Sequence, residues 1–279
     1  MIIKPFNAAH IGLFVFAAAA VLFLRLILRD RSEKARKLVL IVICCVNIVC
    51  FFAYKFALSR DAEFLAVSGI EKFNWFNELP IQLCNINMFL IPIGLIAKKR
   101  PILGFSFFVA PLGAAMALFF PEAAFNGYSL FLPRMLGFCL THLVILICGI
   151  SLAALGLYRP KFSDFPGILI TFICLAIGAH CVNLILRATV CPYANYFFTY
   201  HVDISILNLF WSWIPLPLLY LLPGIVILLA YMLLVSLLFF TADVIREKKL
   251  DDCVHMLGTM SPEDVRGHME GANIFLFTS

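Results

Sequence analysis

AAHIGLFVFAAAAVLFLRLIL, residues 8–28, carries one charged side chain, Arg25. An α-helix rises 1.5 Å per residue, so a run of about 20 apolar residues can cross the hydrocarbon core of a bilayer. Similar runs recur along the 279-residue chain, in which 63% of residues are hydrophobic and 13% are charged. A soluble domain of this length could not bury so much apolar surface. The sequence therefore predicts an all-α, polytopic membrane protein, in which each span satisfies its own backbone hydrogen bonds.

The distribution of apolar runs predicts a bundle of seven transmembrane helices. The expected spans are about 8–28, 38–58, 79–97, 101–120, 135–157, 165–187 and 213–241. Together they form one transmembrane domain over residues 1–245, followed by a cytoplasmic tail over residues 246–279. Within that tail, Ser-Pro-Glu-Asp resembles a helix start, so a short helix is expected near Ser261.

Basic residues set the expected orientation. They gather in the connections after the first, third, fifth and seventh spans, which read RDRSEKARK (29–37), KKR (98–100), YRPK (158–161) and REKK (246–249). The positive-inside rule places these connections in the cytoplasm, with the N-terminus outside and the C-terminus inside. The net charge of +5 is explained by this topology and requires no nucleic-acid partner. The expected location is the cell (inner) membrane, or an internal membrane such as the endoplasmic reticulum in a eukaryote.

The third expected span begins with LPIQLCNINMFLIP (79–92), which places several polar side chains near one end: Gln82, Cys84, Asn85 and Asn87. If the helix starts at Leu79, Cys84 lies about 7–8 Å inside the membrane. The same helical rise puts His142 and His180 about 10 Å deep, from the same side. Ionisable groups within spans are costly and usually functional when they face the bundle interior. The sequence thus predicts a polar layer in the outer half of the membrane.

More residues are expected in that layer. His180, Asn183 and Arg187 fall on one face of the sixth span. His142 lies on a stripe of small residues that would allow close helix packing: Cys139, Gly149, Ala153 and Gly156. The loop before the last span adds Asn195 and His201, and it is long enough to fold back over the layer.

Cys84 and His142 could supply a nucleophile and its base. A thiol attacks as the thiolate, which a nearby imidazole generates by taking the proton. The side-chain amides of Gln82, Asn85 and Asn87, and also His180, could stabilise an oxyanion or bind the substrate. Two alternatives stay open. Cys84 could be a packing residue, as most intramembrane cysteines are, or Cys139 could be the reactive thiol instead.

Four stretches, in this order, resemble the YwaF-like integral membrane proteins of bacteria: LPIQLC (79–84), CLTH (139–142), ANYFFTYH (194–201) and IPLPLLY (214–220). Those proteins are similar to an animal transmembrane acyltransferase family that moves arachidonoyl chains onto lyso-ether phospholipids. The resemblance covers about residues 8–240, and LP-x-x-LC is its most specific element.

The resemblance implies a seven-span bundle that transfers acyl groups with a cysteine and a histidine. By position, these residues are Cys84 and His142, while Asn195 and His201 match an Asn-Tyr motif and the histidine that follows it. Val202 and Asp203 depart from the Lys-Pro pair that usually follows this histidine in the bacterial proteins.

The sequence therefore favours a phospholipid acyltransferase, or acyl hydrolase, with phospholipid and lysophospholipid substrates. No cofactor is expected, and no Cys or His spacing indicates a metal site. The alternative is a non-enzymatic seven-span carrier or sensor that binds a lipid or a small polar ligand in the same layer. Carriers commonly show internal repeats and charges at the midplane, and neither is evident here. A structural partner subunit is a third alternative, and the oligomeric state is left open.

Overall fold

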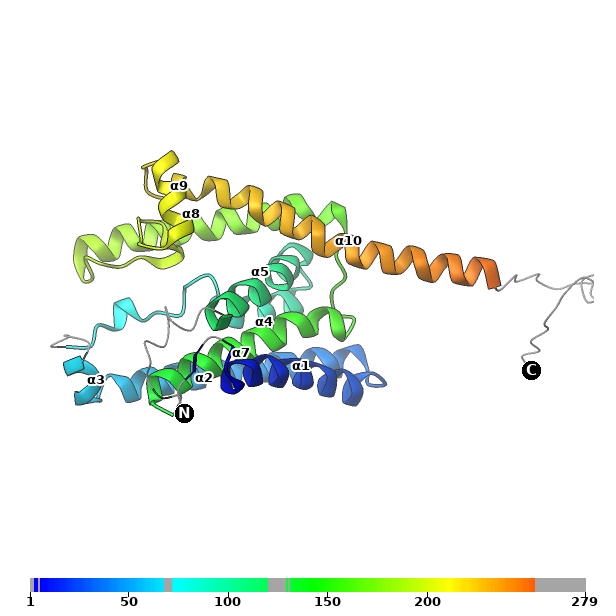
Figure 1. Ribbon diagram of the computed structural model, residues 1–279, viewed down its shortest axis with the longest axis horizontal. Coiled ribbons are helices and arrows are strands. Elements are labelled where there is room, and N and C mark those ends of the chain that lie inside the picture. The colour runs from blue at the N-terminus through cyan, green and yellow to red at the C-terminus, as the bar shows by residue number, and fades with distance from the viewer. Residues whose placement is uncertain (1–2, 5, 68–71, 120–128, 130, 254–279) are drawn as a thin grey trace, which may run out of the picture. The chain divides into compact units, whose positions relative to one another are not determined.

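The computed structural model of the chain describes all residues except 1–2, 5, 68–71, 120–128, 130 and 254–279. The described residues form helices, which are drawn in Figure 1, and contain no β-strand. In chain order they are α1 (Ala8–Leu28), α2 (Glu33–Leu58), α3 (Ala62–Val67), η1 (Trp75–Asn77), α4 (Asn87–Ala97), α5 (Arg100–Phe119), α7 (Pro133–Ala154), η2 (Phe162–Asp164), α8 (Phe165–Thr189), η3 (Tyr196–Phe198), α9 (Ser205–Trp213), η4 (Leu219–Leu221) and α10 (Leu222–Cys253). The helix expected near Ser261 lies outside the described residues.

The chain divides into two compact units, Met1–Ser236 and Leu237–Ser279. The predicted division between a transmembrane domain and a cytoplasmic tail at residue 245 stays a prediction.

Six of the described helices are long and apolar enough to cross a membrane: α1, α2, α5, α7, α8 and α10. The prediction of an all-helical integral membrane protein is confirmed in this form. The first predicted span coincides with α1. The second begins five residues early, at Glu33, because the side chain of Ser32 accepts a hydrogen bond from the Ala35 N–H and caps the helix there.

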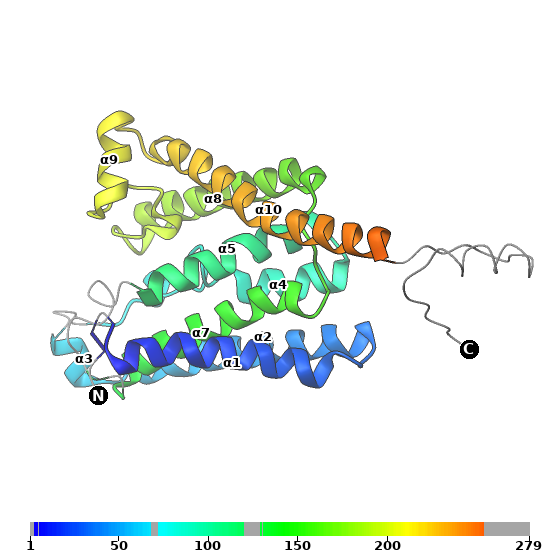
Figure 2. The same ribbon diagram turned by 45° about the vertical axis from the view of Figure 1, so that its right-hand side comes forward.

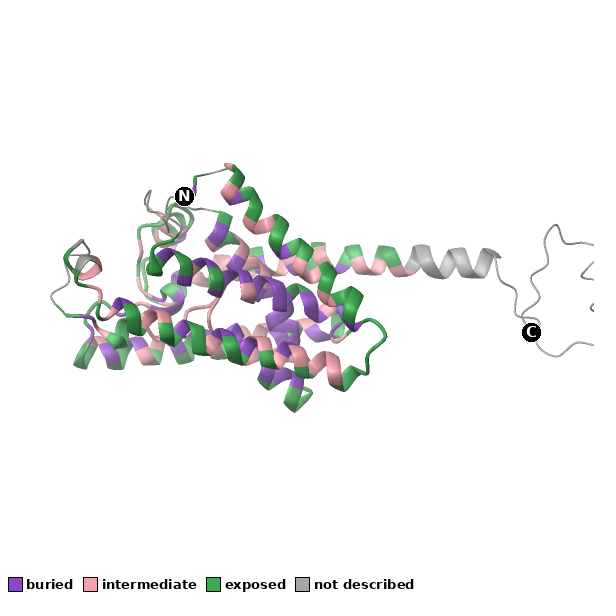
Figure 3. Cartoon of the chain, turned by 90° about the horizontal axis from the view of Figure 1, so that it is seen from below, coloured by how far each residue is buried: buried purple, intermediate pink, exposed green. Residues whose placement is uncertain are grey.

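Large apolar side chains cover the outer faces of these helices. Val49, Ile185 and Val226, on three different helices, are each more than 60% exposed. Water would disfavour such a surface, whereas lipid chains cover it without cost. Figure 3 shows exposed residues along the outer helices and buried residues gathered on the helices between them. The burial pattern is therefore that of a bundle solvated by lipid.

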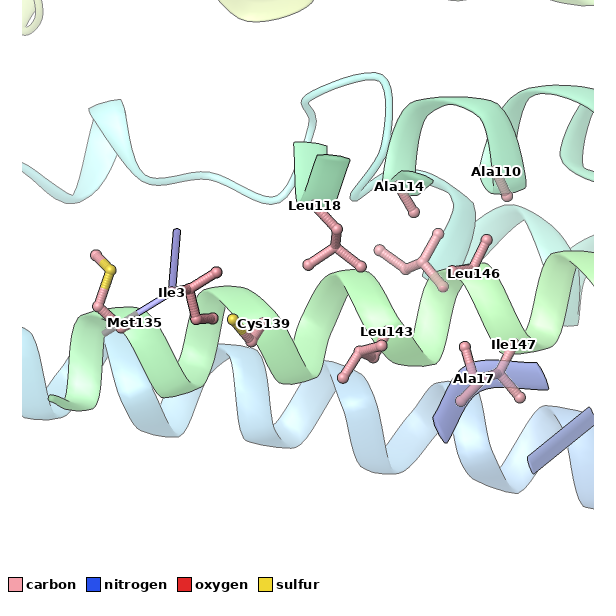
Figure 4. Close-up of a cluster of buried hydrophobic side chains, with 11 residues drawn as sticks. Ile3, Ala17, Ala110, Ala114, Leu118, Met135, Cys139, Leu143, Leu146 and Ile147 are labelled. Carbon is pink, nitrogen blue, oxygen red and sulfur yellow. The ribbon is translucent and has the colours of Figure 1, made fainter. Parts of the chain in front are cut away.

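Helix α7 is the centre of the first unit and packs on α1, α2, α4 and α5. Figure 4 shows the apolar side chains that fill its contact with α5 and α1: Ala17, Ala110, Ala114, Leu118, Met135, Cys139, Leu143, Leu146 and Ile147, with Ile3 beside them. Helices α7 and α5 approach closely at Gly149, where an added Cβ would lie 2.7 Å from Cδ of Pro111. The predicted close packing along the small-residue stripe is confirmed at this position.

Two ionic contacts mark the two ends of the bundle. At one end Arg100 binds Asp164 through two hydrogen bonds of 3.0 and 2.6 Å, and the Tyr158 hydroxyl donates to the same carboxylate at 3.0 Å. Burial and the nearby carboxylate raise the pKa of Tyr158, so its hydroxyl stays protonated and able to donate. At the other end Lys55 pairs with Glu78. We call these the Arg100 end and the Lys55 end.

The seventh predicted span, 213–241, is placed too early in the chain. A short helix, α9, ends at Trp213, and the long helix α10 begins only at Leu222. Pro215 and Pro217 lack the N–H groups that a continuous helix needs, and Leu218 has a left-handed φ of 63°. The chain therefore turns between α9 and α10 instead of continuing as one helix.

We predict that Gly149→Ala destabilises the bundle. The new methyl group meets the rigid ring of Pro111, and overpacking of this kind costs about 1–3 kcal/mol. Thermal unfolding in detergent should show a lower midpoint for Gly149→Ala than for the parent protein. Gly178→Ala is the control, since nothing lies within 4 Å of that Cβ position on α8. Equal midpoints for the two variants would contradict the packing at Gly149.

Candidate functional site

The sequence predicted that residues 79–86 begin a transmembrane helix, but in the structure this polar segment is not helical. Helix α4 begins at Asn87, and its 11 residues extend about 16 Å, roughly half of the hydrocarbon thickness. Before it, the chain forms turns that are closed by the bonds Ile86 N–H to Gln82 O at 2.9 Å and Asn87 N–H to Cys84 O at 3.2 Å. The third expected span is therefore broken, and the helical depth predicted for Cys84 does not apply.

Neighbouring side chains explain why the segment is irregular. The Leu79 N–H donates to the Tyr196 hydroxyl at 2.9 Å, and Pro80 has no N–H to offer. The apolar side chains of the segment 79–86, including Leu83 and Ile86, pack on α8 and on the loop that follows α8. Irregular backbone at membrane depth is tolerated only when protein covers it or when it lines a cavity. The loop and α8 supply that cover.

Amide side chains hold the loop after α8 against the segment 79–86. We call this set of hydrogen-bonded residues the loop clasp (Gln82, Asn183, Asn195, Tyr196 and Thr199). The Gln82 side chain donates to Asn195 O at 3.3 Å and accepts from the Phe197 N–H at 3.0 Å. Asn195 in turn donates to Tyr200 O and accepts from the Tyr200 N–H, both at 2.9 Å. Gln82 and Asn195, which the sequence assigned to one polar layer, are thus brought together.

Asn183 fastens the same loop to α8. Its amide nitrogen donates to Tyr196 O at 2.9 Å and to the Thr199 hydroxyl at 2.8 Å, while its oxygen accepts from the Tyr196 N–H at 2.8 Å. The ring nitrogen Nδ1 of His180 contacts the Thr199 hydroxyl at 3.0 Å. Asn183 and His180 therefore meet through Thr199. A substrate-binding role for either residue stays a prediction.

Tyr196 and Thr199 are functional parts of the clasp that the sequence analysis did not single out. The Tyr196 hydroxyl donates to Phe76 O at 2.7 Å while it accepts from Leu79 N–H. Burial raises the pKa of Tyr196, so the hydroxyl keeps the proton that it donates. Tyr196 belongs to the Asn-Tyr motif, so the sequence contained a signal for it, but the partners of its hydroxyl are more than 100 residues away along the chain.

Cys84 lies at the turn before α4, against α5. Its thiol is free, and an added Cβ at Gly113 would lie only 2.8 Å from the sulfur. Within the described part of the chain, the backbone N–H groups of Cys84 and Asn85 make no hydrogen bond, and the buried Oδ1 of Asn85 has no partner. The start of a helix carries partial positive charge from such unpaired N–H groups.

The side chain of Asn87 was expected to offer hydrogen-bond donors to a ligand, but it offers an acceptor. Its Nδ2 lies 2.8 Å from Leu83 O and 3.4 Å from Cys84 O, and because carbonyl oxygens only accept, the amide nitrogen must face them. Its Oδ1 is buried without a partner among the described residues. Asn87 can therefore accept a hydrogen bond from a ligand beside Cys84, but its donors are already used. This arrangement favours contact with a ligand donor over stabilisation of an oxyanion, and a role of Asn87 in substrate binding stays a prediction.

His142 is buried in α7 with one ring nitrogen committed. Nδ1 lies 2.8 Å from Phe138 O, which can only accept, so Nδ1 carries the proton and Nε2 holds a lone pair. The buried His10 differs, because Phe6 N–H donates to its Nδ1 and its Nε2 donates to Leu118 O, so both nitrogens are used. His142 thus retains the atom that a general base needs.

Asn47 links the neighbourhoods of Cys84 and His142. Its amide nitrogen lies 3.9 Å from the sulfur of Met88, one turn after Cys84, and 3.4 Å from Thr141 O, next to His142. Asn47 therefore joins α2 to both α4 and α7. No hydrogen bond joins the Cys84 thiol to the His142 ring in the described chain, so their direct pairing stays a prediction.

The remaining candidates lie elsewhere. Cys139 is buried in the apolar cluster between α5 and α7, which is where a packing residue belongs (Figure 4). His201 is exposed, donates from Nε2 to Asn208 Oδ1 at 2.7 Å, and packs with its ring tilted against Trp211. Among the described residues, no group of three His, Cys, Asp or Glu side chains is arranged to hold a metal ion.

Comparisons with known proteins identify one family. A family model described as the TMEM164 family matches residues 5–242, which covers all the helices of the site. No curated protein and no solved structure matches the chain.

We predict that Asn183→Leu opens the loop clasp and exposes Cys191, which is fully buried beside it. The substitution leaves the buried Tyr196 N–H without a partner, at about 1–3 kcal/mol, and leaves the Tyr196 carbonyl with only the Thr199 N–H as donor. A water-soluble maleimide should label Cys191 in this variant, as read by peptide mass spectrometry. Asn208→Leu serves as the control, because Asn208 lies outside the clasp. Protection of Cys191 in both variants would argue against the clasp.

Proposed function

Since the chain belongs to the TMEM164 family, we propose that it is a membrane-embedded acyltransferase, or acyl hydrolase, that acts on phospholipids through Cys84. The observation that carries the proposal is the surroundings of this thiol. A free cysteine precedes a half-length helix inside a membrane protein, beside backbone N–H groups that have no partner. The resemblance of LPIQLC and CLTH to acyltransferase-like membrane proteins supports the same chemistry.

In the first half of the reaction, His142 Nε2 takes the proton of the Cys84 thiol, and the sulfur attacks the carbonyl carbon of a lipid ester. The backbone N–H groups of Cys84 and Asn85 are the donors that we assign to the resulting oxyanion. We prefer them to Asn87, whose amide nitrogen donates to Leu83 O and Cys84 O, and to Gln82, whose amide nitrogen binds Asn195 O. The carbon–oxygen bond of the ester then breaks, and the leaving alcohol takes the proton from His142. The product is a lysolipid and an acyl thioester on Cys84.

In the second half, the hydroxyl group of a lysophospholipid, or water, attacks the thioester. The new carbon–oxygen bond forms as the carbon–sulfur bond breaks, and the electron pair returns to sulfur. His142 accepts the proton of the incoming hydroxyl and returns it to the thiolate. General base catalysis of this kind contributes about 10²–10⁴-fold to the rate. For either half, Cys84 and His142 must meet, and the Asn47 link between their neighbourhoods supports that requirement.

The second candidate is a carrier or sensor, and one observation favours it. Transporters often bind their ligands at the ends of broken helices, and α4 is preceded by irregular backbone. The unpartnered oxygens of Asn85 and Asn87 would then contact a polar ligand. A lipid-like electrophile separates the two functions. An enzyme should label at Cys84 and label more slowly when His142 is changed to Gln, whereas a carrier should show no dependence on His142.

We predict that Cys84→Ala reduces acyl exchange by more than about 10³-fold, because the nucleophile itself is lost. The assay supplies an isotope-labelled phospholipid and an unlabelled lysophospholipid to the purified protein and follows acyl exchange by mass spectrometry. Cys139→Ala is the control for the rival thiol and should retain activity. Loss of exchange in Cys139→Ala with full exchange in Cys84→Ala would reverse the assignment.

We further predict that Gly113→Ala slows exchange while leaving the fold intact. The new methyl group would lie 2.8 Å from the Cys84 sulfur, so the thiol must move, and a displacement of about 1 Å can cost about 10²-fold. Gly12→Ala on α1 is the matched control, because its Cβ position is empty within 4 Å. Unchanged exchange in Gly113→Ala would mean that the position of Cys84 does not control the reaction.

A further inference from the structure

The short helix α9 has three faces of different character. At 100° per residue, Ile206, Leu209 and Trp213 share one sector, and they are 44%, 44% and 60% exposed. The neighbouring sector is polar and consists of Ser205, Asn208 and Ser212. The remaining sector faces protein.

The protein-facing sector is well packed. Phe210 is buried, and one of its ring atoms lies 3.7 Å from the Cβ position of Gly224 in α10. Trp211 lies edge-on to Tyr220 at 5.2 Å between ring centroids and beside His201 at 4.9 Å. These contacts fix the rotation of α9 about its axis. The sector with Ile206, Leu209 and Trp213 therefore points away from the rest of the protein.

The polar sector is part of a hydrogen-bonded chain. His201 donates from Nε2 to Asn208 Oδ1 at 2.7 Å, and Asn208 donates to Asp203 Oδ1 at 2.6 Å. His201 and Asp203 are both exposed. An exposed titratable pair beside an exposed apolar sector requires two different solvents within the width of one helix. Only the boundary between lipid and water offers both.

We propose that α9 lies in the plane of the membrane interface at the Lys55 end, with Ile206, Leu209 and Trp213 among the lipid chains. The occupant of the apolar sector is a lipid surface, and the exposed apolar faces of the spanning helices continue into it. On α10, Leu222 and Val226 are also exposed. Tryptophan favours this depth because its ring is apolar and its N–H is polar.

This interfacial position reaches the Cys84 segment through a short series of contacts. Trp211 packs on Tyr220, whose hydroxyl donates to Tyr200 O at 2.9 Å. The Tyr200 backbone is bonded to Asn195, and the carbonyl of Asn195 accepts from Gln82. Lipid binding by α9 therefore holds the loop clasp at a fixed height in the membrane. The clasp includes Gln82, which is two residues before Cys84. The inference stands on the geometry of α9 and does not require the proposed function.

The experiment uses tryptophan fluorescence, since the full chain has only three tryptophans, Trp75, Trp211 and Trp213. Trp75→Phe with Trp211→Phe leaves Trp213 as the single emitter, and Trp75→Phe with Trp213→Phe leaves Trp211. Each variant is reconstituted in phosphatidylcholine vesicles, with and without bromine atoms on the acyl chains near the glycerol. Iodide is added separately as a quencher confined to water.

The expected result is that brominated lipid removes most of the Trp213 emission, while iodide does not, and that Trp211 is affected much less. The two indoles are only two residues apart, so the difference reports the rotation of α9. Quenching of Trp213 by iodide but not by brominated lipid would overturn the proposal and place this face in water. Absence of both effects would also overturn it, because another protein surface would then cover the face. Equal quenching of both tryptophans by lipid would exclude the assigned sectors.

Discussion

The constraint on which the structure depends is that a bilayer offers no hydrogen bonds to the backbone. A chain inside lipid must satisfy its own N–H and C=O groups, and a continuous helix is the simple solution. Residues 79–86 do not adopt it. They are tolerated because the Tyr196 hydroxyl binds the Leu79 N–H, while the side chains of Gln82 and Asn183 bind the backbone of the loop after α8 and hold it against the segment. The break makes α4 begin only at Asn87, and Cys84 lies in the turn three residues before it.

Among the described residues, three histidines that are buried or half-buried show how hydrogen bonding decides what a side chain can do. His10 uses both ring nitrogens on backbone groups and is therefore structural. His180 contacts Thr199 within the loop clasp. His142 commits Nδ1 to its own helix, which leaves the lone pair of Nε2. The same distinction applies to the side-chain amides. The Asn87 amide nitrogen donates to Leu83 O and Cys84 O, so only its Oδ1, an acceptor, is left for another group.

The loop after α8 connects these features to the membrane surface. Its backbone binds Gln82 on one side and Asn183 on the other, and the hydroxyl of Tyr220, in η4, donates to it as well. Helix α9, which follows this loop, exposes one apolar sector and one polar sector. A lipid surface that binds α9 would thus determine the height at which the clasp, and the turn that carries Cys84, sit in the bilayer.

The sequence by itself determined the class of protein, because long apolar runs leave no fold for a 279-residue chain except a helical bundle in lipid. It also located the segment that matters, because amides and a thiol in an apolar run must find partners. Hydropathy averages over about 20 residues, so it could not distinguish a full helix from the turns at 79–86 or the break at Pro215 and Pro217. Only the tertiary structure decided which donors and acceptors were used, because the groups that bind the Gln82 side chain and the Tyr196 hydroxyl lie more than 100 residues away along the chain. The role of each polar side chain follows from those partners and not from its identity.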